Sequence, residues 1–489
     1  MAYDYDVIVI GGGAAGLTSS GLAVTLGAKT LMIEGERLGG DCTWYGCVPS
    51  KTLLKAAKVA QQSRDAEKYG LSGTELDFSF ARMMEYVRHV REEVYEEADR
   101  PEIFEDLGVE VRAGTASFID DHTISIEGRK SWTVTGRYFV IATGAKAWVP
   151  PIPGLDSVPF LTNESLFELT EQPGRLAIVG GGPIGTEMAQ AFSRLGTHVT
   201  VIDMLDRILS KDDLEASALI QKRLSSEGVN FQLGADVNQI SERAGEIAIS
   251  ITREEATSIV HADALLMATG RRANISSLNL EAAGVEVGRP GIVVNDRCRT
   301  SRRHIYAVGD VTGRYQFTHM SEHMAKVAVT NALLKLPMKI DSRNVPWVTF
   351  TDPEVAHVGA TSADLTQAGT NFQTYRFPYS KVDRAVTDGE TEGVIKVYAK
   401  PSTGRIYGVD IVGTSAGELI SEYALAMKNR ISLRKISDTI HPYPTYGLGA
   451  RRAADQWYVQ KQSPTLVKIL KMIFRYRGPV LEFGPDDIL

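Results

Sequence analysis

Two cysteines, Cys42 and Cys47, lie in the run GGDCTWYGCVPSK, whose residue types are suited to redox chemistry. Five residues of regular α-helix advance about 7.5 Å along the axis, whereas a disulfide needs Cα atoms within about 7 Å of each other. The segment is therefore expected to depart from a regular helix, and Gly46 gives the backbone that freedom. Pro49 fits the first turn of a following helix. That helix N-terminus and the charge of Lys51 would both lower the pKa of a nearby thiol, so the run predicts a reactive cysteine pair.

The element that precedes this pair has the pattern of a dinucleotide-binding unit. An apolar run at 6–10 predicts a buried parallel strand, a glycine turn follows, and a second strand at 30–33 ends in a carboxylate. The glycines allow a tight turn, close approach of a pyrophosphate and close helix–strand packing, and the carboxylate accepts a hydrogen bond from a ribose. The residues assigned to these roles are Gly11, Gly13, Gly16 and Glu34.

The same pattern recurs at 175–203, so the chain is expected to bind two dinucleotides. The turn residues are Gly180, Gly182 and Gly185. Asp203 ends the second strand, and its carboxylate would accept a hydrogen bond from a ribose 2′-hydroxyl but repel a 2′-phosphate. At ~4 Å and an effective dielectric near 20, that repulsion is on the order of 4 kcal/mol. NADH is therefore favoured over NADPH, although the nearby Arg207 leaves NADPH possible.

Later signals mark where the chain passes between domains. The phrases Ala142–Gly144 and Ala268–Gly270 each follow an apolar strand, and a short strand that begins at Ile305 ends at Asp310. After about Pro346 the nucleotide-binding pattern stops. Alternating stretches in the remaining residues predict an antiparallel sheet with flanking helices.

The composition excludes several classes of protein. The length of 489 residues is typical of about three domains. The net charge of −7 provides no overall basic field for nucleic acid. With only three cysteines, the chain is no secreted disulfide scaffold, and a reducing compartment is favoured. No signal peptide fits before the first strand, and no apolar run reaches transmembrane length, so we predict a cytoplasmic protein.

The ordered set of motifs resembles the flavoprotein disulfide reductases, the class I pyridine nucleotide-disulfide oxidoreductases that include dihydrolipoamide dehydrogenase, glutathione reductase and mercuric reductase. The resemblance extends over nearly the whole chain. It rests on Gly11–Gly16 with Glu34, Cys42–Lys51, Ala142–Gly144, Gly180–Glu187, Gly270-Arg271 and Gly309-Asp310. It implies FAD in the first nucleotide fold, NAD(P)H in the second, and a homodimer formed through the C-terminal domain.

The resemblance also implies a role for individual residues. Cys47 would face the flavin ring, and Cys42 would exchange with the substrate. Lys51 would lie near flavin N5 and pair with Glu187, and Asp310 would hydrogen-bond the ribityl chain. Gly144 and Gly270 complete the expected cofactor-binding residues.

The expected fold is α/β, with two Rossmann-like domains and a C-terminal α+β dimerisation domain. The FAD-binding domain is predicted to be discontinuous, over 1–150 and 271–345. The NAD(P)-binding domain is predicted over 151–270. The dimerisation domain and a C-terminal extension are predicted over 346–489.

The C-terminal domain departs from the family pattern. In the dihydrolipoamide and glutathione members, a His-Pro pair followed by a Glu forms an acid–base dyad. Aligned on Pro444-Thr445, this chain has Tyr443 at the His position and Leu448 at the Glu position. A general acid–base group contributes about 10²–10⁴ in rate, so efficient turnover of a dithiol is in doubt. The run Pro442–Thr445 instead resembles the Pro-Tyr-x-Thr of mercuric reductase, although His441 could do the missing work from a shifted position.

Three functions are compatible with these features. The first is electron transfer from NADH through FAD and the cysteine pair to a metal ion, as in mercuric reductase, or to a small disulfide. The second is a dihydrolipoamide dehydrogenase of a 2-oxoacid dehydrogenase complex, with His441 as the base. The third is a low-turnover flavin redox sensor. The catalytic candidates are Cys42, Cys47, Lys51, Glu187, Tyr443 and His441.

Two other patterns carry weaker expectations. Thr465–Arg477 is amphipathic and basic, so it could lie on a membrane surface. A terminal helix packed against the protein is the favoured prediction, and membrane contact is not expected. His319 and His323 lie four residues apart on an expected helix, but no third ligand is evident nearby, so no metal site is predicted.

Overall fold

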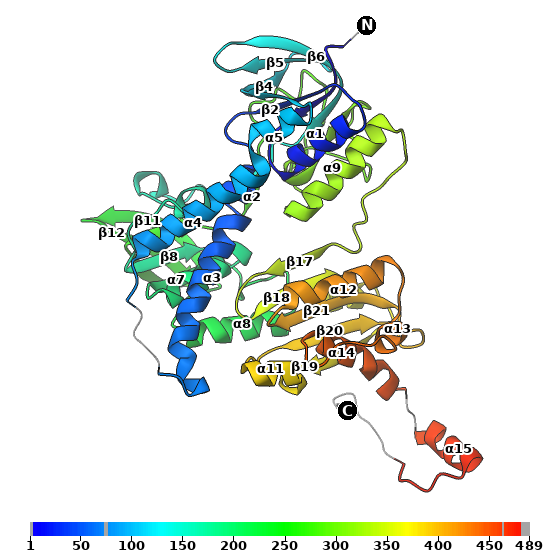
Figure 1. Cartoon of the computed structure of the whole chain (residues 1–489). Helices are drawn as coiled ribbons and strands as arrows, with labels where there is room; N and C mark the ends of the chain where they lie inside the picture. The colour runs from blue at the N-terminus through cyan, green and yellow to red at the C-terminus, as the bar shows by residue number, and fades with distance from the viewer. Residues whose placement is uncertain (1–2, 73–76, 462–463, 481–489) are drawn as a thin grey trace. The chain divides into compact units, whose positions relative to one another are not determined.

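The computed structural model describes residues 3–72, 77–461 and 464–480. The chain divides into two packed units (Figure 1). The first comprises Met1–Asp206 and Glu227–Ile340, and the second comprises Arg207–Ser226 and Asp341–Leu489. The predicted assignment of residue ranges to FAD, NAD(P) and dimerisation stays a prediction. No described helix combines the length and hydropathy needed to cross a bilayer.

The first sheet of unit 1 has the order β3-β2-β1-β6-β5-β4, and β16 also pairs with β6. The strands that pair in parallel are β1 (Tyr5–Ile10), β2 (Thr30–Glu34), β3 (Glu110–Ala113), β6 (Trp132–Ile141) and β16 (Ile305–Ala307). The strands β4 (Thr115–Phe118) and β5 (Thr123–Glu127) extend it in antiparallel fashion. The apolar run Val7–Ile10 is almost wholly buried, which is why it lacks the alternation of a half-exposed strand.

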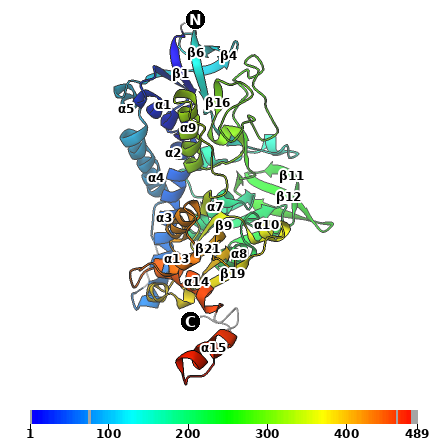
Figure 2. The same cartoon turned by 90° about the vertical axis from the view of Figure 1, so that its right-hand side faces the viewer.

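Helices cover this sheet and lead to the cysteines. The helices α1 (Ala14–Thr25) and α9 (Thr318–Leu333) lie side by side (Figure 2). After β2 the chain forms α2 (Gly40–Trp44), α3 (Cys47–Arg64), α4 (Phe80–Val94) and α5 (Pro101–Asp106). The helix α4 packs on α3.

The second sheet of unit 1 repeats the parallel arrangement in the order β10-β9-β8-β14. Its strands are β8 (Arg175–Val179), β9 (His198–Asp203), β10 (Asn230–Leu233) and β14 (Ala264–Met267). The helix α7 (Pro183–Arg194) follows β8, and α6 (Asn163–Leu166) precedes it. An antiparallel three-stranded sheet is formed by β11 (Asp236–Arg243), β12 (Glu246–Arg253) and β13 (Ala256–Ala262).

Each of the two Ala-Thr-Gly segments leads into a short strand, and these two strands pair with each other. The strand β7 (Ala145–Ala147) follows Gly144 and β15 (Arg271–Ala273) follows Gly270, and the two pair in antiparallel fashion. The two Ala-Thr-Gly segments therefore lie where the chain leaves one parallel sheet for the other.

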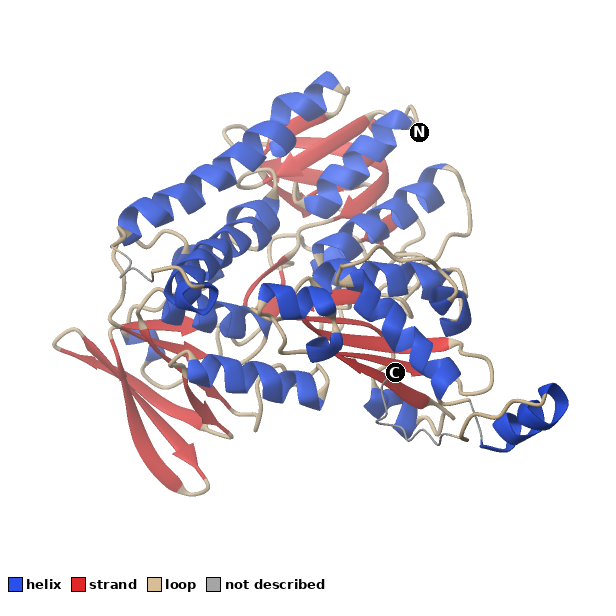
Figure 3. Ribbon diagram, turned by 60° about the horizontal axis from the view of Figure 1, so that its bottom comes forward, coloured by secondary structure: helices blue, strands red, loops and turns tan. Residues whose placement is uncertain are grey.

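Unit 2 is built on an antiparallel sheet of order β17-β18-β21-β20-β19. Figure 3 draws the strands of the chain in red and its helices in blue. Its strands are β17 (Pro346–Thr349), β18 (Glu354–Gly359), β19 (Gln373–Pro378), β20 (Val394–Ala399) and β21 (Ile406–Gly413). Its helices are α8 (Leu214–Ser226), α10 (Ser362–Gln367), α11 (Asp383–Asp388), α12 (Ala416–Lys428), α13 (Leu433–Ser437), α14 (Gly447–Val459) and α15 (Pro464–Phe474). The helix α12 packs on β18 and β21, and α14 packs on β19 and β20, so the predicted sheet with flanking helices is confirmed.

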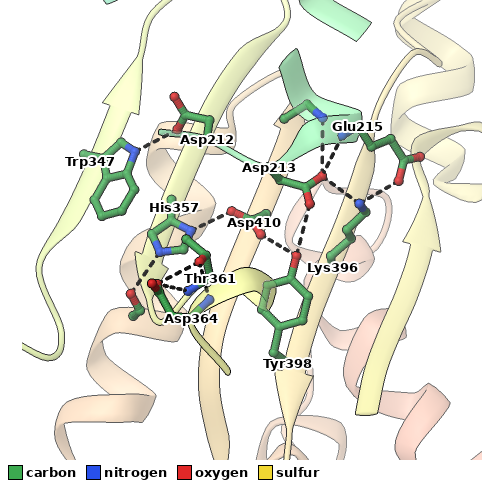
Figure 4. Close-up of polar contacts among 12 residues, drawn as sticks. Asp212, Asp213, Glu215, Trp347, His357, Thr361, Asp364, Lys396, Tyr398 and Asp410 are labelled. Carbon is green, nitrogen blue, oxygen red and sulfur yellow. Dashed lines mark hydrogen bonds and ion pairs between the residues drawn. The ribbon is translucent and has the colours of Figure 1, made fainter. Parts of the chain in front are cut away.

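A row of polar and aromatic side chains crosses this sheet. Trp347, His357, Asp410 and Lys396 are successive cross-strand partners on β17, β18, β21 and β20. His357 Nδ1 lies 2.6 Å from Asp410 Oδ1, and the Tyr398 hydroxyl donates to Asp410 Oδ2 at 2.6 Å (Figure 4). His357 and Asp410 are both buried, so the sheet contains a buried ion pair.

Acidic residues at the start of α8 contact both ends of this row, at Lys396 and at Trp347. Lys396 Nζ lies 2.7 Å from both Asp213 and Glu215, and Trp347 Nε1 donates to Asp212 at 2.8 Å (Figure 4). Burial alone would lower the pKa of His357, but the hydrogen bond and charge of Asp410 outweigh burial and raise that pKa. We name the six residues Asp213, His357, Lys396, Tyr398, Asp410 and Glu215 the polar row.

The predicted packing of the terminal helix is not found. No residue of α15 is buried, and large apolar side chains such as Met472 and Ile473 are 75% and 61% exposed. The apolar periodicity correctly indicated a helix. It does not identify what covers the apolar face, and the described part of this chain does not bury it.

Candidate active site

The helical path is interrupted between the two cysteines. The helix α2 ends at Trp44 and α3 begins at Cys47, so the pair spans a break of two residues. Gly46 occupies the break, where a Cβ would lie 2.8 Å from the carbonyl oxygen of Asp41. Only glycine fits this close approach, and the departure from a regular helix that the five-residue spacing requires is present.

The two thiols form one hydrogen-bonded pair. The side chains of Cys42 and Cys47 are free thiols that form a hydrogen bond with each other. The Thr318 hydroxyl lies 3.6 Å from the Cys47 sulfur. Cys47 is the first residue of α3, and Thr318 is the first residue of α9. Cys47 is an exposed residue, so a bound group or a reagent can approach it.

The two thiols differ in acidity. The hydrogen bond from Cys42, with smaller contributions from Thr318 and Lys51, lowers the pKa of Cys47 to about 6 against the effect of burial. The same hydrogen bond, with burial, raises the pKa of Cys42 above its ordinary value. The proton of the pair therefore stays on Cys42 near neutral pH, and the negative charge is on Cys47.

Lys51 and Glu187 form an ion pair beside the cysteines. Lys51 Nζ donates to both carboxylate oxygens of Glu187, at 2.9 and 3.2 Å. The Glu187 side chain is only 6% exposed and that of Lys51 is 35% exposed. The carboxylate therefore holds the ammonium group in one place while part of the lysine remains accessible. Lys51 also lines an apolar cavity of about 680 Å³ between α3 and α4.

A series of ion pairs that the sequence does not predict connects the cysteine segment to Asp310, the predicted ribityl-binding residue. Arg271 Nη1 donates to Asp41 at 2.8 Å, and Arg271 Nε lies 3.6 Å from Asp310. Asn163 donates to the other oxygen of Asp41 at 2.9 Å. Burial raises the pKa of Asp310 to about 6 although Arg271 opposes the rise. In the sequence, only the position of Arg271 directly after Gly270 indicates that this arginine lies near the site.

The first glycine turn has the features that a dinucleotide requires. Gly13 is the N-cap of α1 and provides no capping side chain, so the first N–H groups of the helix remain open to a phosphate. A Cβ on Gly16 would lie 1.8 Å from the carbonyl oxygen of Gly11, which shows why the packing needs glycine. The carboxylate of Glu34 accepts from Gly12 N at 2.6 Å and from Glu36 N at 2.8 Å, at the end of β2.

The second turn repeats this arrangement. Gly182 is the uncapped N-cap of α7, and Gly185 packs against Gly180 as Gly16 does against Gly11. Asp203 accepts from Gly181 N at 2.5 Å. Arg207 donates to the backbone carbonyls of Ser210 and Asp212. Arg207, the residue that kept NADPH possible as a cofactor, thus donates its hydrogen bonds to the backbone of its own loop.

The acid–base candidates of the C-terminal domain lie in different surroundings. Tyr443 is 69% exposed, and a hydrogen bond to Asp383 raises the pKa of its hydroxyl. His441 Nε2 lies 3.1 Å from Glu422, and its Nδ1 lies 3.0 Å from the carbonyl oxygen of Thr439. Both nitrogens of His441 therefore face acceptors in this conformation.

Among the described residues, one group of three side chains has the spacing of metal ligands, and it is not the His319/His323 pair. It consists of Asp121, His122 and His304, on strand ends of the first sheet. The two imidazole rings stack at 3.9 Å, with one nitrogen of each near a backbone carbonyl. Parallel rings direct their nitrogen lone pairs along parallel planes, which is a poor arrangement for one shared ion.

Comparison with known proteins places this site in a family. The model of the pyridine nucleotide-disulphide oxidoreductases matches residues 5–325, and the model of their dimerisation domain matches residues 345–453. The mercuric reductase of Bacillus cereus is 37% identical over 456 residues, which cover 92% of this chain and 71% of the relative. The dihydrolipoyl dehydrogenase of Bacillus subtilis is 32% identical over 466 residues, which cover 93% and 98%.

Solved structures agree with this placement. The HOCl-induced flavoprotein disulfide reductase RclA from Escherichia coli superposes with a TM-score of 0.82 and 29% identity, over 94% of this chain and 100% of that chain. LpdA from Mycobacterium tuberculosis superposes with a TM-score of 0.86 and 27% identity, over 92% and 99%. The match to the dimerisation domain indicates a homodimer. The chain belongs to the class I pyridine nucleotide-disulfide oxidoreductases, NAD(P)H-dependent flavoenzymes that bind FAD.

Proposed function

We propose that this chain is an NADH-dependent flavoenzyme that passes electrons through Cys42 and Cys47 to a metal ion or a small disulfide. The observation that carries the proposal is the contact between two thiols at a break between helices, beside the Lys51–Glu187 ion pair. Cys47 holds the negative charge and Cys42 holds the proton. A pair with this asymmetry has one sulfur suited to face an electron donor and the other suited to exchange with an acceptor.

Bound FAD and NADH supply the two-electron and hydride chemistry, and the chain's own residues position the reacting groups. Two electrons and one proton convert the Cys42–Cys47 disulfide into a thiol on Cys42 and a thiolate on Cys47. Lys51, held by Glu187, places a positive charge beside the developing negative charge. The overall reaction with a small disulfide is NADH + H⁺ + RSSR → NAD⁺ + 2 RSH. With a mercuric ion it is NADH + Hg²⁺ → NAD⁺ + H⁺ + Hg⁰.

The C-terminal domain favours a metal ion as the acceptor. Reduction of a thiolate-bound metal ion needs less proton transfer than dithiol exchange, so the absence of a His–Glu dyad matters less. We assign Tyr443 of the partner subunit to the lining of the site, as the dimerisation domain and the Pro-Tyr-x-Thr run support. The 37% identity to a mercuric reductase supports the same choice.

Dihydrolipoamide oxidation is the second candidate, supported by the 32% identity to a dihydrolipoyl dehydrogenase. It would need His441 as the base. In this structure both nitrogens of His441 face oxygen acceptors, so the ring would have to release Glu422 or Thr439 before it could take a proton from a thiol.

An acceptor screen with the FAD-loaded enzyme tests the proposal. NADH oxidation is measured with mercuric and cupric ions, lipoamide and glutathione disulfide, and we expect a metal ion to give the highest kcat/KM. Tyr443→Phe should lower that value, whereas Tyr69→Phe, at an exposed tyrosine outside the site, should not. Dihydrolipoamide oxidation abolished by His441→Ala would select the second candidate. Stable reduced flavin with no active acceptor would indicate a redox sensor.

A further inference from the structure

The terminal helix α15 presents a large apolar surface to solvent. Phe474 and Tyr476 are 58% and 61% exposed, and Ile469 and Ile473 are also exposed. None of the eleven residues of the helix is buried. An exposed apolar surface of this size marks a site of interaction rather than an ordinary scatter of surface side chains.

The apolar and basic residues of α15 lie on opposite sides. With 3.6 residues per turn, Ile469, Leu470 and Ile473 project to one side of the helix, and Lys468 and Lys471 project to the other. The helix is roughly 16 Å long, since each residue adds about 1.5 Å. A helix of this length can lie along a bilayer surface but cannot cross the hydrocarbon core.

The charge of the segment identifies the kind of partner. Residues 464–480 contain four cations and no Asp or Glu, in a chain whose net charge is −7. The cations are Lys468, Lys471, Arg475 and Arg477. Phe474 and Tyr476 stack at a centroid distance of 5.6 Å next to Arg475. Aromatic rings beside cations at the end of an apolar face are typical of the membrane–water interface.

We propose that α15 binds the surface of a membrane rich in anionic phospholipid. Its apolar face enters the region between head groups and acyl chains, while its lysines and the two arginines after it contact lipid phosphates. The proposal does not rest on the identity of the electron acceptor. It places the flavoenzyme at a membrane surface through a helix that is too short to cross the bilayer.

A second copy of the chain is the competing occupant of this face. The dimerisation-domain match ends at residue 453, eleven residues before α15 begins at Pro464, so the family match does not extend to the helix. A cation-only segment also fits a surface of repeated phosphates better than the apolar interior of a dimer interface.

Vesicle sedimentation with the full-length, FAD-loaded dimer tests the proposal. The vesicles contain phosphatidylcholine alone or with about 30% phosphatidylglycerol. We expect binding to the anionic vesicles at low salt and its loss at 0.5 M NaCl, because salt screens the attraction. Lys468→Glu/Lys471→Glu should weaken the partition coefficient by about 30-fold or more. Ile469→Ser/Ile473→Ser should weaken it by about 10-fold or more.

Matched variants separate the helix from general charge effects. Lys130→Glu/Lys211→Glu makes the same change in net charge at exposed lysines outside α15, and its binding should equal that of the wild type. Deletion of residues 481–489, which contain three acidic residues, should leave binding at least as strong. All variants should keep NADH-dependent flavin reduction, which shows that they are folded.

Three results would overturn the proposal. The first is no sedimentation with anionic vesicles at low salt. The second is equal binding by the wild type and both α15 variants. The third is conversion of the dimer to a monomer, in analytical ultracentrifugation, when residues 464–489 are deleted, because α15 would then cover a second copy of the chain.

Discussion

The cysteine site of unit 1 and the polar row of unit 2 are both clusters of interacting ionisable groups, but they differ in accessibility. In the polar row, His357 and Asp410 are buried, and each nitrogen or oxygen of the pair has a partner. In the cysteine site, Cys47 carries the lower pKa and is exposed. The His357–Asp410 pair is closed to reagents, whereas Cys47 has an exposed side on which chemistry can occur.

This difference shows that a shifted pKa alone does not identify a reactive residue. Asp410 raises the pKa of His357, and Cys42 lowers the pKa of Cys47, by the same kind of short-range hydrogen bond. Structural ion pairs perturb pKa values as active sites do. Accessibility separates the two cases, and substitutions should therefore affect turnover in one cluster and stability in the other.

The largest effect is expected at Cys47. Cys47→Ser cannot form the disulfide, so reduction of the acceptor should fall by at least about 10³-fold, while NADH still reduces bound FAD. The long-wavelength thiolate–flavin absorbance band should disappear in an anaerobic NADH titration. Cys298→Ser, at a buried cysteine, is the control and should keep both activities. A band that survives in Cys47→Ser would reverse the roles assigned to the two sulfurs.

The second effect is on stability and concerns the polar row. Asp410→Asn leaves His357 buried without its ionic partner, which should lower the free energy of unfolding by about 3–5 kcal/mol. Urea unfolding followed by circular dichroism measures this difference. The exposed carboxylate Glu392, 3.7 Å from Arg223, is the control, and Glu392→Gln should change stability by less than about 0.5 kcal/mol.

The pH dependence of that difference has a definite sign. Asp410 raises the pKa of folded His357 above its ordinary value of 6.5. The ion pair therefore contributes fully below about pH 6.5, and its contribution is lost as the pH rises through the folded pKa. The stability difference between the wild type and Asp410→Asn should shrink as the pH rises. A difference that stays constant as the pH rises from about 6 would show that His357 is already neutral in the folded protein.

The two clusters also differ in how far the sequence predicts them. The cysteines and Lys51 lie within ten residues, so local spacing was enough to indicate a reactive pair and a broken helix. The glycine turns were equally local, and the predicted α/β fold is confirmed by the structure and the family match. Glu187 and Asp310 came from the family resemblance, since nothing in their own surroundings indicates the site.

Contacts that depend on strand register could not be predicted. The polar row requires His357, Asp410 and Lys396 to be cross-strand neighbours, although more than fifty residues separate the first two in the chain. Likewise, Arg271 reaches Asp41 only because β15 pairs with β7. Amphipathic periodicity predicted the helix α15 but not its exposure, because the pattern does not identify the partner of the apolar face.

A smaller effect on turnover is expected at Glu187. Glu187→Gln keeps the shape of the side chain and removes the charge that holds Lys51, so flavin reduction by NADH should slow by about 10- to 100-fold. Stopped-flow absorbance of the FAD-loaded enzyme measures this step. Glu227→Gln is unsuitable as a control because it also breaks a buried pair, with Arg194. Glu85→Gln, at an exposed glutamate of α4, should leave the rate unchanged.

The smallest effect is a shift in the titration of the exposed thiolate. Because the pKa of Cys47 is lowered to about 6, the thiolate–flavin band should be complete at neutral pH and half lost near pH 6 as the solution is acidified. Thr318→Val removes a hydrogen bond to this sulfur worth about 0.5–1.5 kcal/mol. The midpoint should then rise by about 0.4–1 pH unit, since one unit corresponds to 1.36 kcal/mol. A wild-type midpoint near the ordinary thiol pKa of 9.0 would show that neither Cys42 nor Thr318 stabilises the thiolate of Cys47. Exposure alone would then distinguish the cysteine site from the buried His357–Asp410 pair.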